Sequence, residues 1–344
     1  MHLAGVLTPI PTPFDQRDEV DAGLLRSSLT RWLTTPLTGF VVLGSNGEAA
    51  LIDEDESDRV VAMAREVVPR GRAFIVGTGR ESTRAAIAAT TRAAALGADA
   101  VLVRTPGFFK AQMTAHTFVR HYTAVADASP VPVLLYNFTA VTGVTLPVDA
   151  VAELARHPNI PGMKESNGDV ARIRALVAAA PTGFSVLAGS ASTFLEALEA
   201  GATGGILALA SVLPDACTRL FELARSARRE EAKALQQQLT PLATFLGSTH
   251  GVPALKAALK LVGCDVGQPR PPLVPLDAST LSDLRALLSA FQEETGGAQP
   301  QGYDGSPPSL RHGYDESVEA LAKAEASSER GTGLRDISYG HTAS

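Results

Sequence analysis

Several features that commonly carry function are scarce in this chain of 344 residues. It has two cysteines, Cys217 and Cys264, which excludes a disulfide framework and a cysteine-rich zinc site and is typical of free thiols in a reducing compartment. Aromatic residues make up 5%, so the core must be built mainly from Ala, Val, Leu and Ile. Acidic residues outnumber basic ones, 36 to 30, and no block of Lys and Arg occurs. We therefore expect neither nucleic acid nor an anionic membrane as a partner.

Several sequence motifs are missing as well. No run of about 18 apolar residues is free of charge, so we expect no membrane span. The N-terminus lacks the basic and apolar regions of a secretory signal, which predicts a cytoplasmic protein and leaves import into an organelle open. No P-loop, GxSxG, HxxxH or HExxH motif is present, and Gly77-Thr78-Gly79 lacks the third glycine of a dinucleotide fingerprint. We expect no cofactor and no metal ion.

What is present is apolar material for a large core, 45% of the chain. Over the first 210 residues, short apolar runs alternate with Ala/Leu/Arg/Glu-rich segments of helical length. Most of these runs show no polar/apolar alternation, which is typical of parallel strands covered by helices on both faces. The expected strands are Gly5–Thr8, Phe40–Leu43, Phe74–Gly77, Ala100–Val103, Val131–Tyr136, Gly162–Lys164, Ser185–Ala188 and Gly205–Leu209.

Eight strands with helical crossovers predict an α/β fold, a (β/α)8 TIM barrel. The alternative is an open doubly wound sheet, which usually has fewer strands and is favoured by a nucleotide loop after the first strand. The segment Thr8–Pro13 (TPIPTP) is not such a loop.

The boundaries of several helices can be read from the sequence. Asp53 and Glu56 have the spacing of a reciprocal helix cap, and Gly97 and Gly201 are expected to end helices. From Pro214 onward the pattern is helical, with breaks at 251–253 and 268–272. We predict the barrel over 1–225, a C-terminal helical appendix over 226–295, and a disordered tail over 296–344, where Gly, Pro and Ser are frequent.

Three short segments with polar side chains follow expected strands: Gly44–Glu48, Tyr136-Asn137 and Gly162–Ser166. The carboxyl ends of barrel strands are where active sites are built. Lys164 ends the sixth strand, and burial in the barrel favours the uncharged amine that attacks a ketone. The simpler interpretation is a lysine paired with a carboxylate, but Tyr136 one strand earlier makes a catalytic role the better hypothesis.

Six collinear segments carry a family resemblance: Gly5–Phe14 (GVLTPIPTPF), Gly44–Glu48 (GSNGE), Tyr136-Asn137 with Thr142-Gly143, Asn159–Ser166 (NIPGMKES), Ala188–Ser190 and Gly201–Ala210. Together they resemble the pyruvate-dependent class I aldolases of the dihydrodipicolinate synthase and N-acetylneuraminate lyase family. The resemblance spans about residues 4–290. GSNGE and VLAGSA look most like the 4-hydroxy-2-oxoglutarate aldolases and related 2-keto-3-deoxy sugar-acid aldolases of that family.

The resemblance implies roles for individual residues. Lys164 would form a Schiff base with the C2 carbonyl of a 2-oxo acid, and Tyr136 would transfer protons. Ser45 and Asn46 would offer backbone N–H groups to the substrate carboxylate, and the Ser45 hydroxyl would join Tyr136 in a proton relay. Gly189 and Ile206 would line the pyruvate pocket. A homotetramer, a dimer of dimers, is the assembly that the resemblance implies.

Four positions depart from the family pattern. Val141 stands where dihydrodipicolinate synthases have an arginine that binds a second carboxylate, which weakens that assignment. Thr139 replaces a usual proline, and Ser211 replaces a common asparagine. The family usually places a tyrosine in the fourth loop, reaching into the neighbouring subunit's relay, whereas Phe108 and Phe109 stand there in this chain. The relay would then be shortened, replaced by water or broken.

The sequence thus predicts a Schiff-base aldolase that cleaves a 4-hydroxy-2-oxo acid, of the 4-hydroxy-2-oxoglutarate or 2-keto-3-deoxy sugar-acid type, to pyruvate and an aldehyde. Two alternatives remain open. One is a dihydrodipicolinate synthase-like condensing enzyme or a dehydratase on the same scaffold. The other is a catalytically silent homologue that binds a 2-oxo acid, against which the presence of both Lys164 and Tyr136 argues.

Overall fold

A computed structural model describes residues 3–294 of the chain, so the tail predicted over 296–344 lies outside the described residues. Eight parallel strands form a closed barrel in sequence order, with β8 pairing back to β1. This confirms the predicted TIM barrel. The strands are β1 (Gly5–Pro9), β2 (Gly39–Val42), β3 (Ala73–Gly77), β4 (Ala100–Arg104), β5 (Val133–Asn137), β6 (Gly162–Glu165), β7 (Ser185–Ala188) and β8 (Gly204–Ile206).

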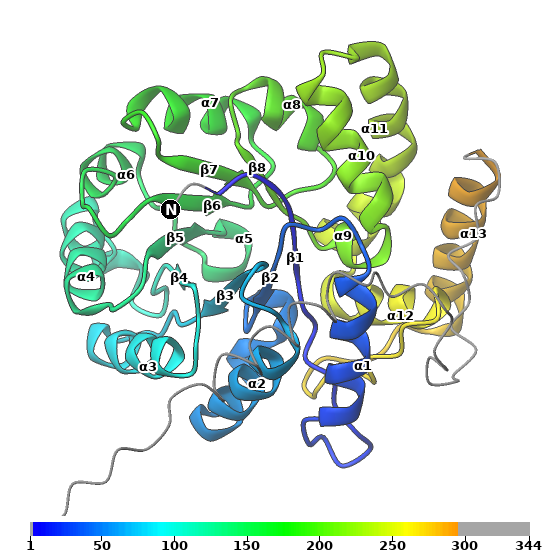
Figure 1. Ribbon diagram of the computed structural model, residues 1–344, viewed down its shortest axis with the longest axis horizontal. Helices are drawn as coiled ribbons and strands as arrows, with labels where there is room; N and C mark the ends of the chain where they lie inside the picture. Colours follow the sequence, from blue (N-terminus) through cyan, green and yellow to red (C-terminus); the bar gives the residue numbers. More distant parts are fainter. Residues whose placement is uncertain (1–2, 295–344) are drawn as a thin grey trace, which may run out of the picture. The chain divides into compact units, whose positions relative to one another are not determined.

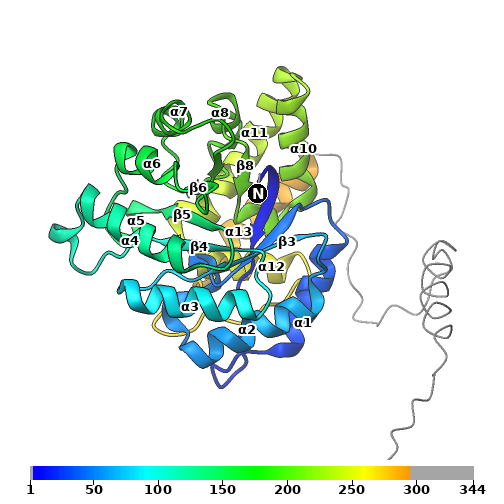
Figure 2. The same cartoon turned by 60° about the vertical axis from the view of Figure 1, so that its left-hand side comes forward.

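Helices follow the strands and surround them (Figure 1), and α1, α2 and α3 lie along one flank of the barrel (Figure 2). They are α1 (Ala22–Leu33), α2 (Glu54–Val67), α3 (Thr83–Ala95), α4 (Ala115–Ala128), α5 (Thr139–Thr142), α6 (Val148–Leu154), α7 (Val170–Ala179), α8 (Phe194–Glu199), α9 (Leu209–Val212) and α10 (Pro214–Arg225). Short helical turns are η1 (Ser45–Gly47), η2 (Ala49–Leu51), η3 (Lys110–Gln112) and the π-helical η4 (Phe245–Thr249). No helix among residues 3–294 is long and apolar enough to cross a membrane.

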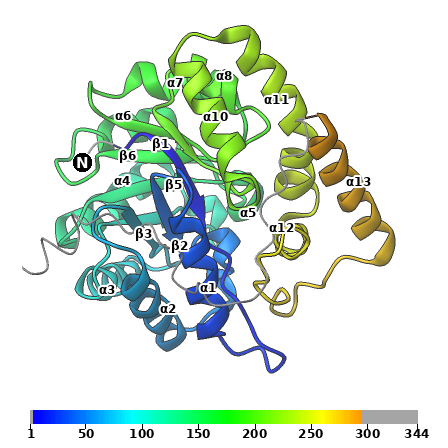
Figure 3. The ribbon, with the colours of Figure 1, turned by 45° about the vertical axis from the view of Figure 1, so that its right-hand side comes forward.

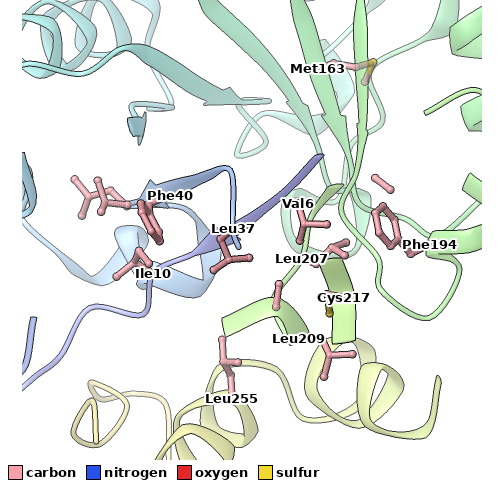
Figure 4. Close-up of a cluster of buried hydrophobic side chains, with 14 of the residues drawn as sticks. Val6, Ile10, Leu37, Phe40, Met163, Phe194, Leu207, Leu209, Cys217 and Leu255 are labelled. Atoms are coloured by element: carbon pink, nitrogen blue, oxygen red, sulfur yellow. The ribbon is translucent and has the colours of Figure 1, made fainter. Parts of the chain in front are cut away.

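The C-terminal appendix consists of α11 (Arg229–Thr244), α12 (Gly251–Leu261) and α13 (Ala278–Glu294), which lie beside α10 on one flank (Figure 3). Leu255 of α12 belongs to the same buried cluster as Leu209 of α9 and Cys217 of α10 (Figure 4). The appendix therefore shares a core with the barrel. Its division from the barrel at residue 225 stays a prediction.

The core has two layers because both faces of the strands are buried. The inner layer fills the barrel with side chains such as Leu7, Val41 and Tyr136, and the outer layer packs the alternate residues, such as Val6 and Phe40, against the helices. Val6 and Phe40 appear in the outer cluster of Figure 4. Both layers are apolar, which explains why the strands show so little alternation in the sequence.

The predicted helix ends agree with the structure. Asp53 accepts a hydrogen bond from the Glu56 N–H at 2.8 Å, and the Glu56 carboxylate accepts one from the Asp53 N–H at 3.2 Å, which completes the cap. Gly97 and Gly201 follow α3 and α8 with φ of 99° and 102°, which only glycine adopts readily. The break expected over 251–253 differs from the structure: the helix is interrupted at His250, and Gly251 already begins α12.

The eighth expected strand differs from the structure at its end. We expected a strand over Gly205–Leu209, but β8 ends at Ile206 and Leu209 begins α9. Every residue from Ile206 to Leu209 is apolar, so hydrophobicity does not separate the end of a buried strand from the start of a buried helix.

Candidate active site

The structure brings together three of the predicted residues at the carboxyl ends of β2, β5 and β6. Tyr136 and Lys164 are direct neighbours in the register of β5 and β6, and each is only 4% exposed. The Lys164 Nζ lies 4.6 Å from the centre of the Tyr136 ring. The Tyr136 Oη and the Ser45 Oγ are 2.9 Å apart, a hydrogen-bond distance. The Lys164 amine, the Tyr136 phenol and the Ser45 hydroxyl thus form a cluster of polar side chains in an otherwise apolar barrel.

Ser45 reaches Tyr136 because the chain turns sharply after β2. Leu43 has a positive φ of 56°, an uncommon conformation for a residue with a side chain. A Cβ on Gly77, at the end of β3, would lie 1.9 Å from the Leu43 carbonyl oxygen. Glycine at 77 is therefore required for this turn. The Thr12 Oγ1 donates a hydrogen bond to the Gly47 carbonyl at 2.7 Å and holds η1 from the β1 side.

The end of the same loop is fixed by a buried ion pair with the C-terminal appendix. The Glu48 Oε1 and the Lys256 Nζ are 2.6 Å apart, and the side chains are 0% and 1% exposed. The second Glu48 oxygen accepts a hydrogen bond from the Arg270 backbone N–H at 2.8 Å. Glu48 itself has a φ of 56°. The appendix therefore holds in place the residue that immediately follows η1.

The β6 end is supported by Glu165, whose side chain is fully buried behind the strand. Its carboxylate accepts hydrogen bonds from the Asn137 side-chain amide at 2.9 Å, the Arg172 Nε at 2.7 Å and the Asn167 N–H at 3.0 Å. The Asn137 oxygen in turn accepts from the Leu146 N–H at 2.8 Å. These bonds link the ends of β5 and β6, the two strands that carry Tyr136 and Lys164.

A cavity opens on the Ser45–Tyr136 hydrogen bond, and Arg104 at the end of β4 also lines it. Lys164 does not line this cavity; it is buried against the Tyr136 ring. The described lining residues are Leu43, Gly44, Ser45, Ala50, Gly77, Gly79, Leu102, Arg104, Tyr136, Phe138, Val141 and Thr142. Within residues 3–294, no group of three His, Cys, Asp or Glu side chains is arranged to hold a metal ion.

The predicted substrate-binding residues occupy different positions. Asn46 is half-buried and follows Ser45 in η1, and Ile206 is fully buried in the barrel interior with Tyr136. Gly189 follows β7, and its N–H donates to the Glu165 carbonyl at 2.7 Å. A Cβ at Gly189 would lie 1.9 Å from the Ser166 Oγ. Gly189 therefore provides space at the strand end, because any side chain there would clash with Ser166. Its N–H is not available to a substrate because it is bonded to the Glu165 carbonyl.

The departures from the family pattern have clear structural settings. Val141 is 61% exposed and lines the cavity. Thr139 exchanges hydrogen bonds with the Asn167 side chain at 2.9 and 3.0 Å, which holds the loop after β5 without a proline. Phe108 and Phe109 are 77% and 67% exposed, with their rings edge to face at 5.1 Å. Neither phenylalanine lines the cavity of this chain.

Sequence reasoning missed Arg104 and its partner Glu81. The Arg104 Nη1 and the Glu81 Oε1 are 2.7 Å apart, and the other Glu81 oxygen accepts from the Gly107 and Phe108 N–H groups, both at 2.9 Å. Burial acts to raise the Glu81 pKa, but the Phe108 N–H, Arg104 and the Gly107 N–H together keep it below its ordinary value. The available signal was an arginine directly after the apolar run Ala100–Val103.

Comparison with known proteins shows the family to which the chain belongs. The model of the dihydrodipicolinate synthetase family matches residues 2–291. A 4-hydroxy-tetrahydrodipicolinate synthase of Exiguobacterium sp. is 36% identical over 292 residues, which cover 85% of this chain and 99% of the relative. A probable mitochondrial 4-hydroxy-2-oxoglutarate aldolase of Emericella nidulans is 36% identical over 296 residues, 85% of this chain and 94% of the relative.

Among solved structures, the dihydrodipicolinate synthase of Acinetobacter baumannii in complex with pyruvate is 32% identical, with a TM-score of 0.80 over 84% of this chain and 98% of that chain. The fold and the site define a TIM-barrel protein with a buried lysine beside a tyrosine. The chain belongs to the dihydrodipicolinate synthetase family, whose members named above include a synthase and an aldolase.

Proposed function

We propose that this protein is a class I aldolase that cleaves a 4-hydroxy-2-oxo acid to pyruvate and an aldehyde, with Lys164 as the Schiff-base residue. The observation that carries the proposal is the buried group in which the Lys164 amine lies against the Tyr136 ring and Tyr136 is hydrogen-bonded to Ser45. A buried amine beside a proton-transferring phenol is the arrangement that this chemistry needs.

In the proposed reaction, the Lys164 amine attacks the C2 carbonyl, and the carbinolamine loses water to give an iminium. Tyr136, which has given its phenol proton to the hydroxyl that leaves the carbinolamine as water, then takes the proton of the C4 hydroxyl as the C3–C4 bond breaks, which releases the aldehyde and leaves an enamine. Protonation of the enamine at C3 and addition of water then release pyruvate and restore the amine. Ser45 and Tyr136 both line the cavity, and their hydrogen bond provides a route for the proton. Asn46 and the Ser45 backbone would bind the substrate carboxylate, and Gly189 and Ile206 would shape the pyruvate pocket.

The test is reductive trapping. Borohydride added with pyruvate should attach one reduced pyruvate per chain, at Lys164 in a peptide map, and Lys164→Ala should give no adduct and no turnover. Lys260→Ala is the matched control because Lys260 is an exposed lysine of α12, paired with Asp265 at 3.4 Å; it should behave like the wild type. An adduct at Lys110, Lys256 or Lys260 would refute the assignment.

A condensing synthase is the second candidate, because the first relative named above is a 4-hydroxy-tetrahydrodipicolinate synthase. Against it, the family resemblance places a carboxylate-binding arginine where this chain has Val141, which carries no charge. Consumption of pyruvate together with aspartate semialdehyde, at a rate above cleavage of 4-hydroxy-2-oxo acids, would favour the synthase.

We propose a homotetramer as the assembly, with a cytoplasmic location. The exposed rings of Phe108 and Phe109 supply apolar surface of the kind that subunit contacts bury. Light scattering tests the assembly, since a mass of 35.8 kDa, that of one chain, would reject it.

A further inference from the structure

We infer that Arg104 is a specificity residue that binds a second anionic group at the far end of the substrate, so that the favoured substrate is a 4-hydroxy-2-oxo acid with two carboxylates. The inference rests on the proposed function and names the substrate class of the same site. It places the positive charge on β4, away from the position of Val141.

The charge of the cavity favours an anionic group. Among its described lining residues, Arg104 is the one that carries a charge. Most of the other lining residues are apolar, among them Leu102, Phe138 and Val141. A guanidinium facing a partly apolar cavity is more attractive to a carboxylate than one in open water, since fewer water molecules screen it.

The position of Arg104 also suits the far end of the substrate. Arg104 and Tyr136 are partners in the register of β4 and β5, and Tyr136 is the partner of Lys164 in the register of β5 and β6. Three adjacent strand ends therefore present, in order, a guanidinium, a phenol and an amine. A substrate with C2 on Lys164 and its C4 hydroxyl at Tyr136 extends its next carbon toward β4.

The Arg104 guanidinium is held in place at one nitrogen, while its other nitrogens stay available. The Arg104 Nη1 is occupied by Glu81 at 2.7 Å and by the Thr105 carbonyl at 3.2 Å. The Nε and Nη2 make no hydrogen bond to the described part of the chain that the structure records. An arginine offers several N–H donors in one plane, so the unused ones can bind a carboxylate while Glu81 holds the group.

Two neighbouring residues make this orientation possible. A Cβ on Gly79 would lie 2.5 Å from the Arg104 Cγ, so glycine at 79 leaves room for the stem of the arginine. Glu81 is itself anchored by the N–H groups of Gly107 and Phe108 at 2.9 Å. The arginine is therefore oriented before any substrate arrives, which reduces the entropy lost on binding.

The test compares two substrates that differ at the far end alone. 4-Hydroxy-2-oxoglutarate carries a carboxylate there, and 4-hydroxy-2-oxopentanoate carries a methyl group. Arg104→Gln should lower kcat/KM for the two-carboxylate substrate by about 10- to 150-fold, the usual loss for a hydrogen bond to a charged group, and leave the other within about 2-fold. Arg104→Lys, which keeps the charge without the planar fork, should fall between wild type and Arg104→Gln.

The matched control is Arg80→Gln. Arg80 also pairs with a glutamate, Glu54 at 2.7 Å, from a loop at the same end of the barrel, but it does not line the cavity. It should leave the ratio of the two kcat/KM values unchanged. Equal losses for both substrates in Arg104→Gln would mean that Arg104 supports the loop only, and would overturn the inference. If Arg104→Gln does not fold, Arg104→Lys decides, since an unchanged ratio there refutes the inference.

Trapping separates this inference from the function on which it rests. Absence of a borohydride adduct with pyruvate at Lys164 in the wild type would refute the proposed function. A normal adduct together with no preference for the two-carboxylate substrate would leave the aldolase in place and refute the role of Arg104. Every Arg104 variant should still form the pyruvate adduct, because pyruvate has no second anionic group.

Discussion

The buried ion pair between Glu48 and Lys256 should decide whether the Ser45 loop keeps its shape. The pair is 2.6 Å apart and essentially unexposed, and the Lys256 Nζ also donates to the Thr12 and Gln268 carbonyls at 2.8 and 2.9 Å. Lys256→Met would leave the Glu48 carboxylate buried with the Arg270 N–H as its recorded partner. Removing one member of a buried pair typically costs about 3–5 kcal/mol.

The pair as a whole should contribute much less than this. Burial lowers the Lys256 pKa, and the attraction of Glu48 offsets that effect only in part. Taking the two charges out of water therefore costs at least as much as their attraction returns. We expect the double variant Glu48→Gln, Lys256→Met to be more stable than the sum of the single losses predicts, by at least about 2 kcal/mol, since no unpaired charge stays buried.

The assay is urea unfolding at pH 7, followed by circular dichroism, of the wild type, Lys256→Met, Glu48→Gln and the double variant. Lys260→Met is the control, because Lys260 lies one turn further along α12 and its pair with Asp265 is mostly exposed; its loss should be below about 1 kcal/mol. A Lys256→Met loss no larger than that of Lys260→Met, or strict additivity in the double variant, would refute the reasoning. Turnover should fall in Lys256→Met at temperatures where it is still folded, because Glu48 directly follows η1.

Three further predictions concern individual side chains. Tyr136→Phe should lower turnover by about 10²- to 10⁴-fold while the pyruvate adduct at Lys164 still forms, and near-normal steady-state rates would refute its proton-transfer role. Burial lowers the His121 pKa to about 4, so the folded state resists protonation and stability is lost as pH falls from about 6.5 toward 4. Between pH 7 and pH 5 this loss should be about 2 kcal/mol, and His121→Gln should remove it from the urea-unfolding difference. Phe109→Tyr should keep the assembly and raise turnover, because it adds a hydroxyl to the relay. Unchanged kinetics on several substrates would mean that Phe109 acts by packing alone.

The parts of this protein that follow from local physics could be predicted from the sequence. The eight strands came from apolar runs of strand length, because parallel strands buried on both faces need such runs. The cap of Asp53 and Glu56 depends on a spacing of three residues. Tyr136 and Lys164 were expected to meet because each ends a strand, and all barrel strands end at one face.

The rest was decided by tertiary structure. Leu209 begins a helix although its apolar run suggested a strand, because packing on α10 and α12, not hydrophobicity, selects between the two. Glu48 pairs with Lys256, although the two residues are far apart in the sequence, and no periodicity in the sequence encodes such a pair. Arg104 is a similar case. The sequence shows an arginine at the end of an expected strand, but only the closed barrel places it at the cavity beside Tyr136. The reason is that the neighbours of a side chain are set by which strands adjoin and in what register.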